Sequence, residues 1–301
     1  MCCLVFTGIL SPMASNDCSH GQSLHSGRDS SGSIAFASYA GGNWEIWSLS
    51  PIGNNPLQLT HSQEEEQYPA LSPDGSKLAY ATNLGEIWIL GPGKMPKKIP
   101  SLPENCTHPA WSPDGGKIVF VAYTFIDGKE DSDLWIADLD TGLVKKLALL
   151  DNIQRNPAWS PDGSRIVFTS AYLPDNGSPI EDLYIINADG THPVCLVANG
   201  FANIQPHWSS NGDTILFASN QTGNMEIWIK GLKGGAAKQL TRHAAYDGDP
   251  CWSPDGAQLC FVSTRSGKMD IWVMERDGKN PRQLTGFTEK HADSKDPHWH
   301  P

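Results

Sequence analysis

The stretch Asp249-Pro250-Cys251-Trp252-Ser253-Pro254-Asp255-Gly256 decides the fold of this chain, because its second half recurs along the sequence. Further copies and close variants of Trp-Ser-Pro-Asp-Gly stand at Leu71–Gly75, Trp111–Gly115, Trp159–Gly163 and Trp208–Gly212. Each copy precedes a short apolar run that ends in an aromatic residue, such as Leu259-Cys260-Phe261. A repeat of about 40–50 residues with several short strands per unit is typical of a β-propeller.

The unit around Trp252 reads as four strands. Asp249–Trp252 is a short first strand, A, and Ser-Pro-Asp-Gly then turns the chain, because Pro fixes φ near about −65° and Gly tolerates positive φ. Gln258–Ser263, Asp270–Val273 and Arg282–Thr285 follow as strands B, C and D. The A–B and C–D turns lie on one face of such a blade, and the B–C and D–A loops lie on the other.

Strand C supplies the blade count, because an acidic–aliphatic–aromatic triplet recurs in it. The triplets are Glu45-Ile46-Trp47, Glu86-Ile87-Trp88, Asp133-Leu134-Trp135, Asp182-Leu183-Tyr184, Glu226-Ile227-Trp228 and Asp270-Ile271-Trp272. We expect the acids to accept local backbone or turn hydrogen bonds and the aromatic residues to wedge adjacent blades together. The sequence therefore predicts an all-β, six-bladed propeller of four-stranded antiparallel blades.

The two ends of the chain complete each other. No Pro-x-Trp strand precedes Ile34, whereas Asp296-Pro297-His298-Trp299 stands at the far end with no further repeat behind it. We expect this C-terminal segment to form the innermost strand of the first blade and so to close the ring. Residues 1–31 are expected to be a flexible lead and a possible signal remnant, and residues 32–301 the propeller.

Composition narrows the class of partner. The net charge of −11 argues against binding to nucleic acid or to anionic membranes, which both need a basic surface. The apolar run Cys2–Leu10 is too short to span a membrane and resembles the end of a secretory signal. The seven cysteines show no C-x-x-C spacing. We expect a periplasmic or secreted monomer, with a cytoplasmic location as the alternative, and no cofactor.

The succession Pro-x-Trp-Ser-Pro-Asp-Gly, apolar-aromatic strand, acidic-Ile-Trp and Gln-Leu-Thr resembles the β-propeller repeat of TolB-type proteins. The resemblance covers residues 32–300 and not the N-terminal α/β domain that TolB carries ahead of its propeller. It implies a TolB-like propeller, with an envelope lipoprotein as the expected partner if the role is also TolB-like. The same repeat occurs in propeller domains of prolyl-oligopeptidase-like proteases and in some sugar lyases, so it specifies the fold more closely than the activity.

The face of the B–C and D–A loops varies most and is the expected binding face. Ala122–Ser132 and Ala171–Glu181 are its longer B–C loops. By repeat symmetry, the residue before each strand-A proline should ring the mouth of the central channel; these are Tyr68, His108, Asn156, Gln205, Asp249 and Asp296. Acidic loop residues should add to the same surface; these are Glu64, Glu65, Glu66 and Asp247. A rim satisfied by water alone is the alternative.

The sequence lacks several common catalytic motifs, so a binding role is the main hypothesis. The chain has no Gly-x-Ser-x-Gly elbow, no Walker-type loop and no His-Glu-x-x-His. We therefore expect a non-enzymatic scaffold that docks an envelope or other protein on the acidic loop face and channel mouth. The alternatives are a metal-dependent carbohydrate-active enzyme of the pectic-sugar lyase type and a component that acts with a separate catalytic subunit. His108, His207 and His298 lie near the channel, but we assign no catalytic or metal-binding residue.

Overall fold

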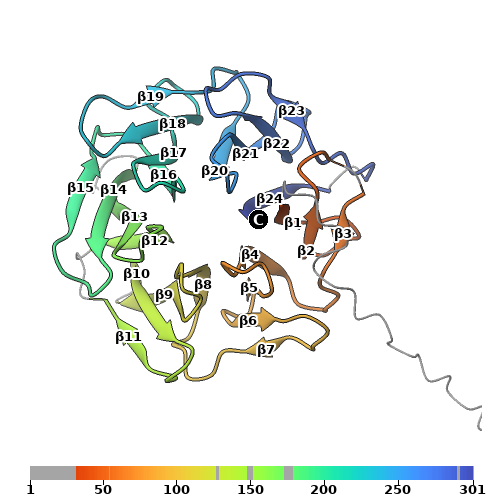
Figure 1. Ribbon diagram of the computed structural model, residues 1–301, viewed down its shortest axis with the longest axis vertical. Helices are drawn as coiled ribbons and strands as arrows, with labels where there is room; N and C mark the ends of the chain where they lie inside the picture. The colour runs from red at the N-terminus through yellow and green to blue at the C-terminus, as the bar shows by residue number, and fades with distance from the viewer. Residues whose placement is uncertain are drawn as a thin grey trace, which may run out of the picture.

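A computed structural model describes residues 32–53, 55–126, 129–147, 152–172, 179–289 and 292–300. It contains six four-stranded antiparallel sheets arranged radially around a central axis, which confirms the predicted fold (Figure 1). The proposed lead, residues 1–31, lies outside the described residues. None of the described residues forms a helix, and none therefore provides a helical membrane span.

Every blade runs from its A strand at the axis to its D strand at the rim (Figure 1). Blade 1 is β24 (Ser294–His300), β1 (Ser33–Ser38), β2 (Glu45–Leu49) and β3 (Leu57–Gln58). Blade 2 is β4 (Glu66–Leu71), β5 (Leu78–Thr82), β6 (Ile87–Leu90) and β7 (Lys97–Lys98). Blade 3 is β8 (Cys106–Trp111), β9 (Lys117–Ile126), β10 (Lys129–Asp138) and β11 (Val144–Lys146). Blade 4 is β12 (Ile153–Trp159), β13 (Arg165–Tyr172), β14 (Ile180–Asn187) and β15 (Val194–Val197). Blade 5 is β16 (Asn203–Trp208), β17 (Thr214–Ser219), β18 (Glu226–Gly231) and β19 (Lys238–Gln239). Blade 6 is β20 (Asp247–Trp252), β21 (Gln258–Ser263), β22 (Asp270–Glu275) and β23 (Arg282–Gln283).

The ring closes through blade 1, as the sequence predicted. Strand β24 pairs antiparallel with β1, and Trp299 stands opposite Ile34. Trp299 is buried in a hydrophobic cluster that also contains Phe36 of blade 1 and Cys260 and Leu284 of blade 6. The last strand of the sequence therefore completes the core between the first and last blades.

The core lies between the blades and rests on the aromatic residue of each B strand. The fully buried phenylalanines are Phe36, Phe120, Phe168, Phe217 and Phe261, and Tyr80 takes the same place in blade 2. The tryptophan of strand A reaches back to the preceding blade: the indole N–H of Trp111 donates to the Ala70 carbonyl at 2.9 Å. Trp208 repeats this bond to the Ala158 carbonyl at 3.1 Å. These tryptophans join blades, as expected.

In five blades the acid of the strand-C triplet is bound by a residue in or just after strand D, whereas Asp182 Oδ1 of blade 4 is buried without a hydrogen-bond partner among the described residues. In blade 5, Glu226 accepts a 2.6 Å bond from the hydroxyl of Thr241, which in turn accepts the Ile227 N–H at 2.9 Å. Blades 1 and 6 repeat this arrangement with Glu45 and Asp270. Where strand D carries lysine, an ion pair replaces it, as between Glu86 and Lys98 at 2.6 Å. The acids are therefore structural in these blades.

The B–C connection of blade 3 differs from its prediction. Ala122–Ser132 was expected to be a loop, but β9 and β10 pair residue by residue from Lys117↔Asp138 to Ile126↔Lys129. Tyr123, Thr124, Phe125 and Ile126 are aromatic or β-branched residues, which favour strand structure. Most of the predicted loop of blade 3 is therefore strand. In blade 4, residues 173–178 of the predicted Ala171–Glu181 loop lie outside the described residues.

Candidate functional site

A β-bulge in every A strand places the six predicted ring residues. Each has positive φ: Tyr68 54°, His108 50°, Asn156 51°, Gln205 56°, Asp249 48° and Asp296 53°. At each, the pairing of the A strand with its B strand changes register. The sequence placed these residues at the ends of the D–A loops, whereas they lie inside the strands, because pairing starts two residues earlier. Since a bulge re-aims side chains, the distortion sets their direction.

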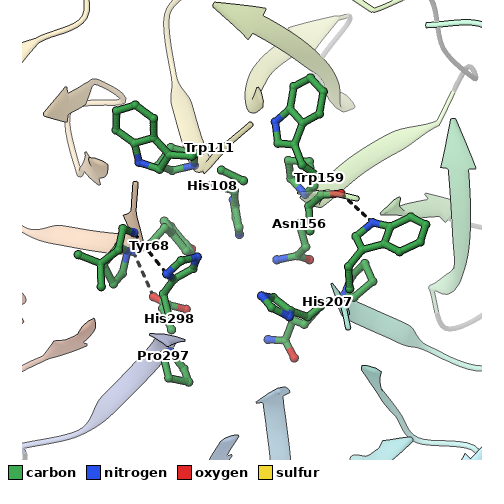
Figure 2. A pocket seen from close by; sticks show the side chains of 18 of the residues that line it. Tyr68, His108, Trp111, Asn156, Trp159, His207, Pro297 and His298 are labelled. Carbon is green, nitrogen blue, oxygen red and sulfur yellow. Dashed lines mark hydrogen bonds between the residues drawn. The ribbon is translucent and has the colours of Figure 1, made fainter. Parts of the chain in front are cut away.

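Left-handed φ at residues other than glycine is costly, by roughly 1–3 kcal/mol each, and such strain is concentrated at functional sites. All six ring residues line one central cavity of about 330 Å³. Their side chains are partly exposed, while the proline after each is buried. In Figure 2, the side chains of His108, Asn156 and His207 point into the space enclosed by the inner strands. The backbone thus directs one polar or aromatic side chain per blade into the channel.

The ring residues of neighbouring blades are hydrogen-bonded head to tail. Gln205 Oε1 accepts the backbone N–H of Asp249 at 2.9 Å, and the Asp249 carboxylate accepts the N–H of Asp296. Asp296 Oδ2 accepts the N–H of Tyr68 at 3.4 Å. Side chains of blades 5, 6 and 1 therefore satisfy the backbone donors that the bulges leave unpaired in blades 6, 1 and 2.

Two carboxyl groups in this chain share a poorly hydrated environment. Burial and the nearby charge of Asp296 raise the pKa of Asp249 to about 8. Burial also raises the pKa of Asp296, against the opposing effect of Lys295, whose Nζ lies 3.8 Å from Asp296 Oδ2. At neutral pH the pair therefore holds a proton for most of the time, and it can both donate and accept hydrogen bonds.

The sector of the ring beside Asp296 is aromatic. The rings of Tyr68 and His108 are stacked with centroids 3.9 Å apart. Burial lowers the pKa of His108 to about 3, with smaller contributions from Arg155 and Lys295, so this imidazole is neutral at physiological pH. Its Nδ1 is buried and has no hydrogen-bond partner among the residues that the structure describes. The sector therefore offers a ligand an aromatic surface.

A second layer of side chains lies deeper in the channel, in the middle of each Pro-x-Trp. His207 Nδ1 accepts the N–H of Trp252 at 3.5 Å, and His298 Nδ1 accepts that of Leu71 at 3.3 Å. The centroids of the two imidazole rings are 6.4 Å apart. His108 lies in the ring and the other two histidines in this layer, as their places on either side of proline predicted. No group of three or more His, Cys, Asp or Glu among the described residues is arranged to hold a metal ion.

The acidic loop residues do not all reach the surface that the sequence predicted. Asp247 is fully buried and paired with Arg265 at 2.6 Å. Glu66 is buried beside Glu45, and burial raises its pKa to about 7. Both belong to the paired start of strand A, two residues before the bulge. Glu64 and Glu65 remain partly exposed on this face.

Two basic residues at the ring were not predicted from the sequence. Arg155 pairs with Glu130 at 2.6 Å and lies 3.9 Å from Glu181, joining blades 3 and 4. Lys295 lies over the rings of Trp44 and Tyr68, at 4.5 and 5.5 Å from their centroids. Each precedes a ring residue in sequence, so its position in the repeat was a signal that could have found it. The channel mouth is therefore of mixed charge rather than uniformly acidic.

Fold and site together define a closed six-bladed propeller with a polar ring at one mouth of its central channel. The chain belongs to the TolB beta propeller domain family, which matches residues 51–222 and 196–301. Among solved structures it is similar to TolB from Acinetobacter baumannii, with 23% identity and a TM-score of 0.75 over 90% of this chain and 67% of that one. A TolB candidate from Agrobacterium tumefaciens has 23% identity and a TM-score of 0.68, over 85% and 89% of the two chains.

An enzyme shares the same architecture. An oligogalacturonate lyase in complex with manganese has 17% identity and a TM-score of 0.62, over 87% of this chain and 76% of that one. No curated protein matches the chain in sequence. At these identities the solved structures establish the fold. They do not establish the activity, which must be inferred from the residues of the site.

Proposed function

We propose that this propeller is a non-enzymatic scaffold that docks a protein partner, an envelope lipoprotein or another protein, at the ring mouth of its central channel. The observation that carries the proposal is the repeated bulge. Six strained backbone positions, one per blade, direct six different side chains into one cavity. Bonds to the backbone of the next blade account for the side chains of Gln205, Asp249 and Asp296. The polar or aromatic side chains of Tyr68, His108 and Asn156 are what a docking ring would add.

The chemistry of the ring suggests what the partner presents. Asp249 and Asp296 favour a basic or hydrogen-bond-donating group, since a carboxylate accepts charge-assisted bonds from both. The stacked Tyr68 and His108 provide an aromatic wall that an apolar or planar side chain covers well. A partner loop or chain end carrying a basic residue beside an aromatic one fits both sectors.

The family membership also supports a proposal about location. We propose a periplasmic or secreted protein, in keeping with TolB-like propellers and with the apolar start of the sequence. The chain is expected to act as a monomer, because the ring needs no second copy to be complete.

The test is affinity capture from envelope and soluble extracts, comparing wild type with D249N/D296N. Asparagine tolerates positive φ and keeps an acceptor oxygen, so it changes charge with little strain, whereas alanine would lose the bonds to the next blade. Wild type should enrich a discrete partner, and the double variant should lose most of it. The matched control is D213N/D277N, which removes two partly exposed acids from the opposite face. Equal capture by wild type and both variants would reject the ring as the docking site.

The lyase-type alternative is separated by a second measurement. The likeness to the manganese-bound oligogalacturonate lyase motivates it. Purified protein is incubated with oligogalacturonate and Mn²⁺, with and without EDTA, and unsaturated products are followed by ultraviolet absorbance. A docking scaffold forms no product in either sample. EDTA-sensitive turnover would replace the proposal with the enzymatic one.

A further inference from the structure

The six blades repeat one cross-strand pair, and blade 6 differs from the others at it. The middle residue of Pro-x-Trp (Pro-Ala-Leu in blade 2) stands opposite one fixed position of the B strand with which it pairs. The pairs are Ala35↔His298, Ala70↔Ala79, Ala110↔Val119, Ala158↔Val167, His207↔Leu216 and Cys251↔Cys260. Blade 6 alone among these carries a thiol on both strands. The other two described cysteines, Cys106 and Cys195, stand opposite Ala122 and Tyr184.

The backbone brings the two thiols within disulfide range. Residues directly opposite one another in an antiparallel pair have Cα atoms about 4.5–5.5 Å apart. Disulfides span Cα separations of about 4.4–6.8 Å. Cys251 and Cys260 are 2% and 0% exposed, and both belong to one buried cluster. The pair can therefore be bridged without moving either strand far.

Cys251 is surrounded by hydrogen-bond donors. The backbone N–H of Trp299 donates to its Sγ at 3.2 Å, and His207 Nε2 lies 3.6 Å from the same sulfur. Because His207 Nδ1 accepts the N–H of Trp252, its Nε2 carries the proton and faces the thiol as a donor. The hydrogen bond from Cys260 and the neighbouring His207 lower the pKa of Cys251, whereas burial raises the pKa of Cys260. The two thiols are thus unequal, as a nucleophile and its resolving partner are.

We propose that Cys251 and Cys260 are a redox modification site, converted to an intramolecular disulfide by a small hydroperoxide such as hydrogen peroxide. The Cys251 thiolate attacks one peroxide oxygen, so that an S–O bond forms, the O–O bond breaks and hydroxide leaves. The Cys260 thiol then gives up its proton and attacks the Cys251 sulfur, which forms the S–S bond and releases hydroxide that takes up the proton as water. Two thiols are oxidised by two electrons and one peroxide is reduced to water and hydroxide.

The channel offers the oxidant a path. Pro250 and His207, which flank the thiol in sequence and in space, both line the central cavity, as does His298. A molecule of the size of hydrogen peroxide that reaches these side chains is one imidazole away from Cys251. Larger oxidants would be excluded, because the sulfur itself is buried.

The site lies at the seam where the ring closes. Trp299 belongs to β24, so the sulfur of Cys251 holds a backbone donor of the closing strand. In the disulfide, Cys251 no longer has a thiolate or thiol to accept this bond at full strength, while a covalent link now joins β20 to β21. Oxidation is therefore expected to change the stability of the contact between blades 6 and 1.

The test is hydrogen peroxide treatment of the folded, full-length protein at neutral pH. The protein is then denatured, free thiols are alkylated with N-ethylmaleimide, and each cysteine is quantified by peptide mass spectrometry. Cys251 and Cys260 should lose alkylation together, on one tryptic peptide that becomes lighter by two hydrogens, and dithiothreitol should restore both. Buried Cys106 should stay alkylated throughout, since it has no thiol opposite.

Two variants assign the roles. In C260S the resolving thiol is absent, so peroxide should leave Cys251 as a sulfenic acid that dimedone traps. In C251S, Cys260 should be no more reactive than Cys106. The double variant C251A/C260A reproduces the Ala70↔Ala79 pair of blade 2 and is expected to fold; its melting temperature should be insensitive to peroxide, unlike that of wild type. Full alkylation of Cys251 and Cys260 at peroxide concentrations that oxidise the exposed Cys195 would overturn the proposal.

Discussion

Asp296 Oδ2 accepts the backbone N–H of Tyr68 at 3.4 Å, although the two residues are 228 positions apart in the sequence. The bond joins blade 1, through its closing strand, to blade 2. It also uses a side chain of the docking ring for a structural purpose. The ring residues of blades 5, 6 and 1 therefore have two roles, since they face the channel and they fix the backbone of the next blade.

Removal of the closing strand should be strongly destabilising. Deletion of Lys295–Pro301 removes buried Trp299 and exposes the inner edge of β1. Loss of one buried tryptophan costs about 3–5 kcal/mol, and the lost strand pairing adds to it, so the melting temperature should fall by roughly 10 °C or more. Differential scanning calorimetry measures this, with M95A as the control because Met95 is 82% exposed. An unchanged melting temperature would show that β24 does not hold the ring closed.

Loss of the Thr241 hydroxyl should lower the free energy of unfolding more than loss of the ion pair at the equivalent position of another blade. T241V leaves both the buried Glu226 carboxylate and the Ile227 N–H without their partner. We expect the free energy of unfolding to fall by about 2–3 kcal/mol, and T241S to restore most of it. Chemical denaturation checks both values.

The comparison for this prediction is K98M in blade 2. Lys98 pairs with Glu86 at 2.6 Å, but its side chain is 50% exposed, so water screens the pair. Its loss should cost less than about 1 kcal/mol. A larger loss in K98M than in T241V would contradict our account of the strand-C acids.

Asp249 should make stability depend on pH in the direction opposite to an ordinary salt-bridged acid. Its pKa rises from 3.8 in the unfolded chain to about 8 on folding, so the folded state binds the proton more tightly. Its contribution is therefore full below about pH 4 and is lost as the pH rises towards 8. The side chain that D249N introduces cannot ionise. The melting temperature of D249N relative to wild type should therefore rise by about 2–4 °C as the pH is raised from 5 to 8.5.

The control for this titration is D255N. Hydrogen bonds from Ser253 and from the backbone of Ala257 lower the pKa of Asp255, so it stays ionised throughout this range. Its melting temperature should run parallel to that of wild type from pH 5 to pH 8.5. A D249N curve that also runs parallel would refute the raised pKa of Asp249.

Gly85 should be irreplaceable at the junction of blades 2 and 3. Its carbonyl accepts the N–H of Cys106 at 2.8 Å, and a Cβ at this position would lie 2.5 Å from the Asn105 Cα. G85A must push two backbones apart, and we expect it to cost about 3 kcal/mol. In G93A, φ is similarly positive but the space is open, so only about 1 kcal/mol should be lost. Equal losses in thermal denaturation would mean that φ, and not the close approach, restricts residue 85.

The repeat made the architecture predictable from sequence, because each Trp-Ser-Pro-Asp-Gly turn is a local structure whose residues determine its shape. In the turn of blade 4, Asp162 accepts bonds from the Ser160 hydroxyl at 2.6 Å and from the Ser164 N–H at 3.0 Å, all within a few residues. Closure by Trp299 was predictable for a different reason, since one strand was missing at the start and one was left over at the end.

The details of the site were less predictable, because they depend on contacts between blades. Asp247 and Asp249 look alike in sequence, yet the first is buried against Arg265 and the second faces the channel. The bulge between them, which single-sequence alternation does not show, reverses the direction of the side chains. The thiol pair was hidden likewise, because Cys251 and Cys260 become neighbours only through the strand register.

Closure through β24 also dictates an order of assembly during synthesis. Blades 2 to 6 are each contiguous in sequence and can form as the chain emerges from the ribosome, whereas β1 to β3 are made first and must wait for the final strand. The pairing of Ile34 with Trp299 spans almost the whole chain, and such distant contacts form slowly. Until β24 has been synthesised, the inner edge of β1 therefore stays unpaired. The ring can close only after translation of the last strand.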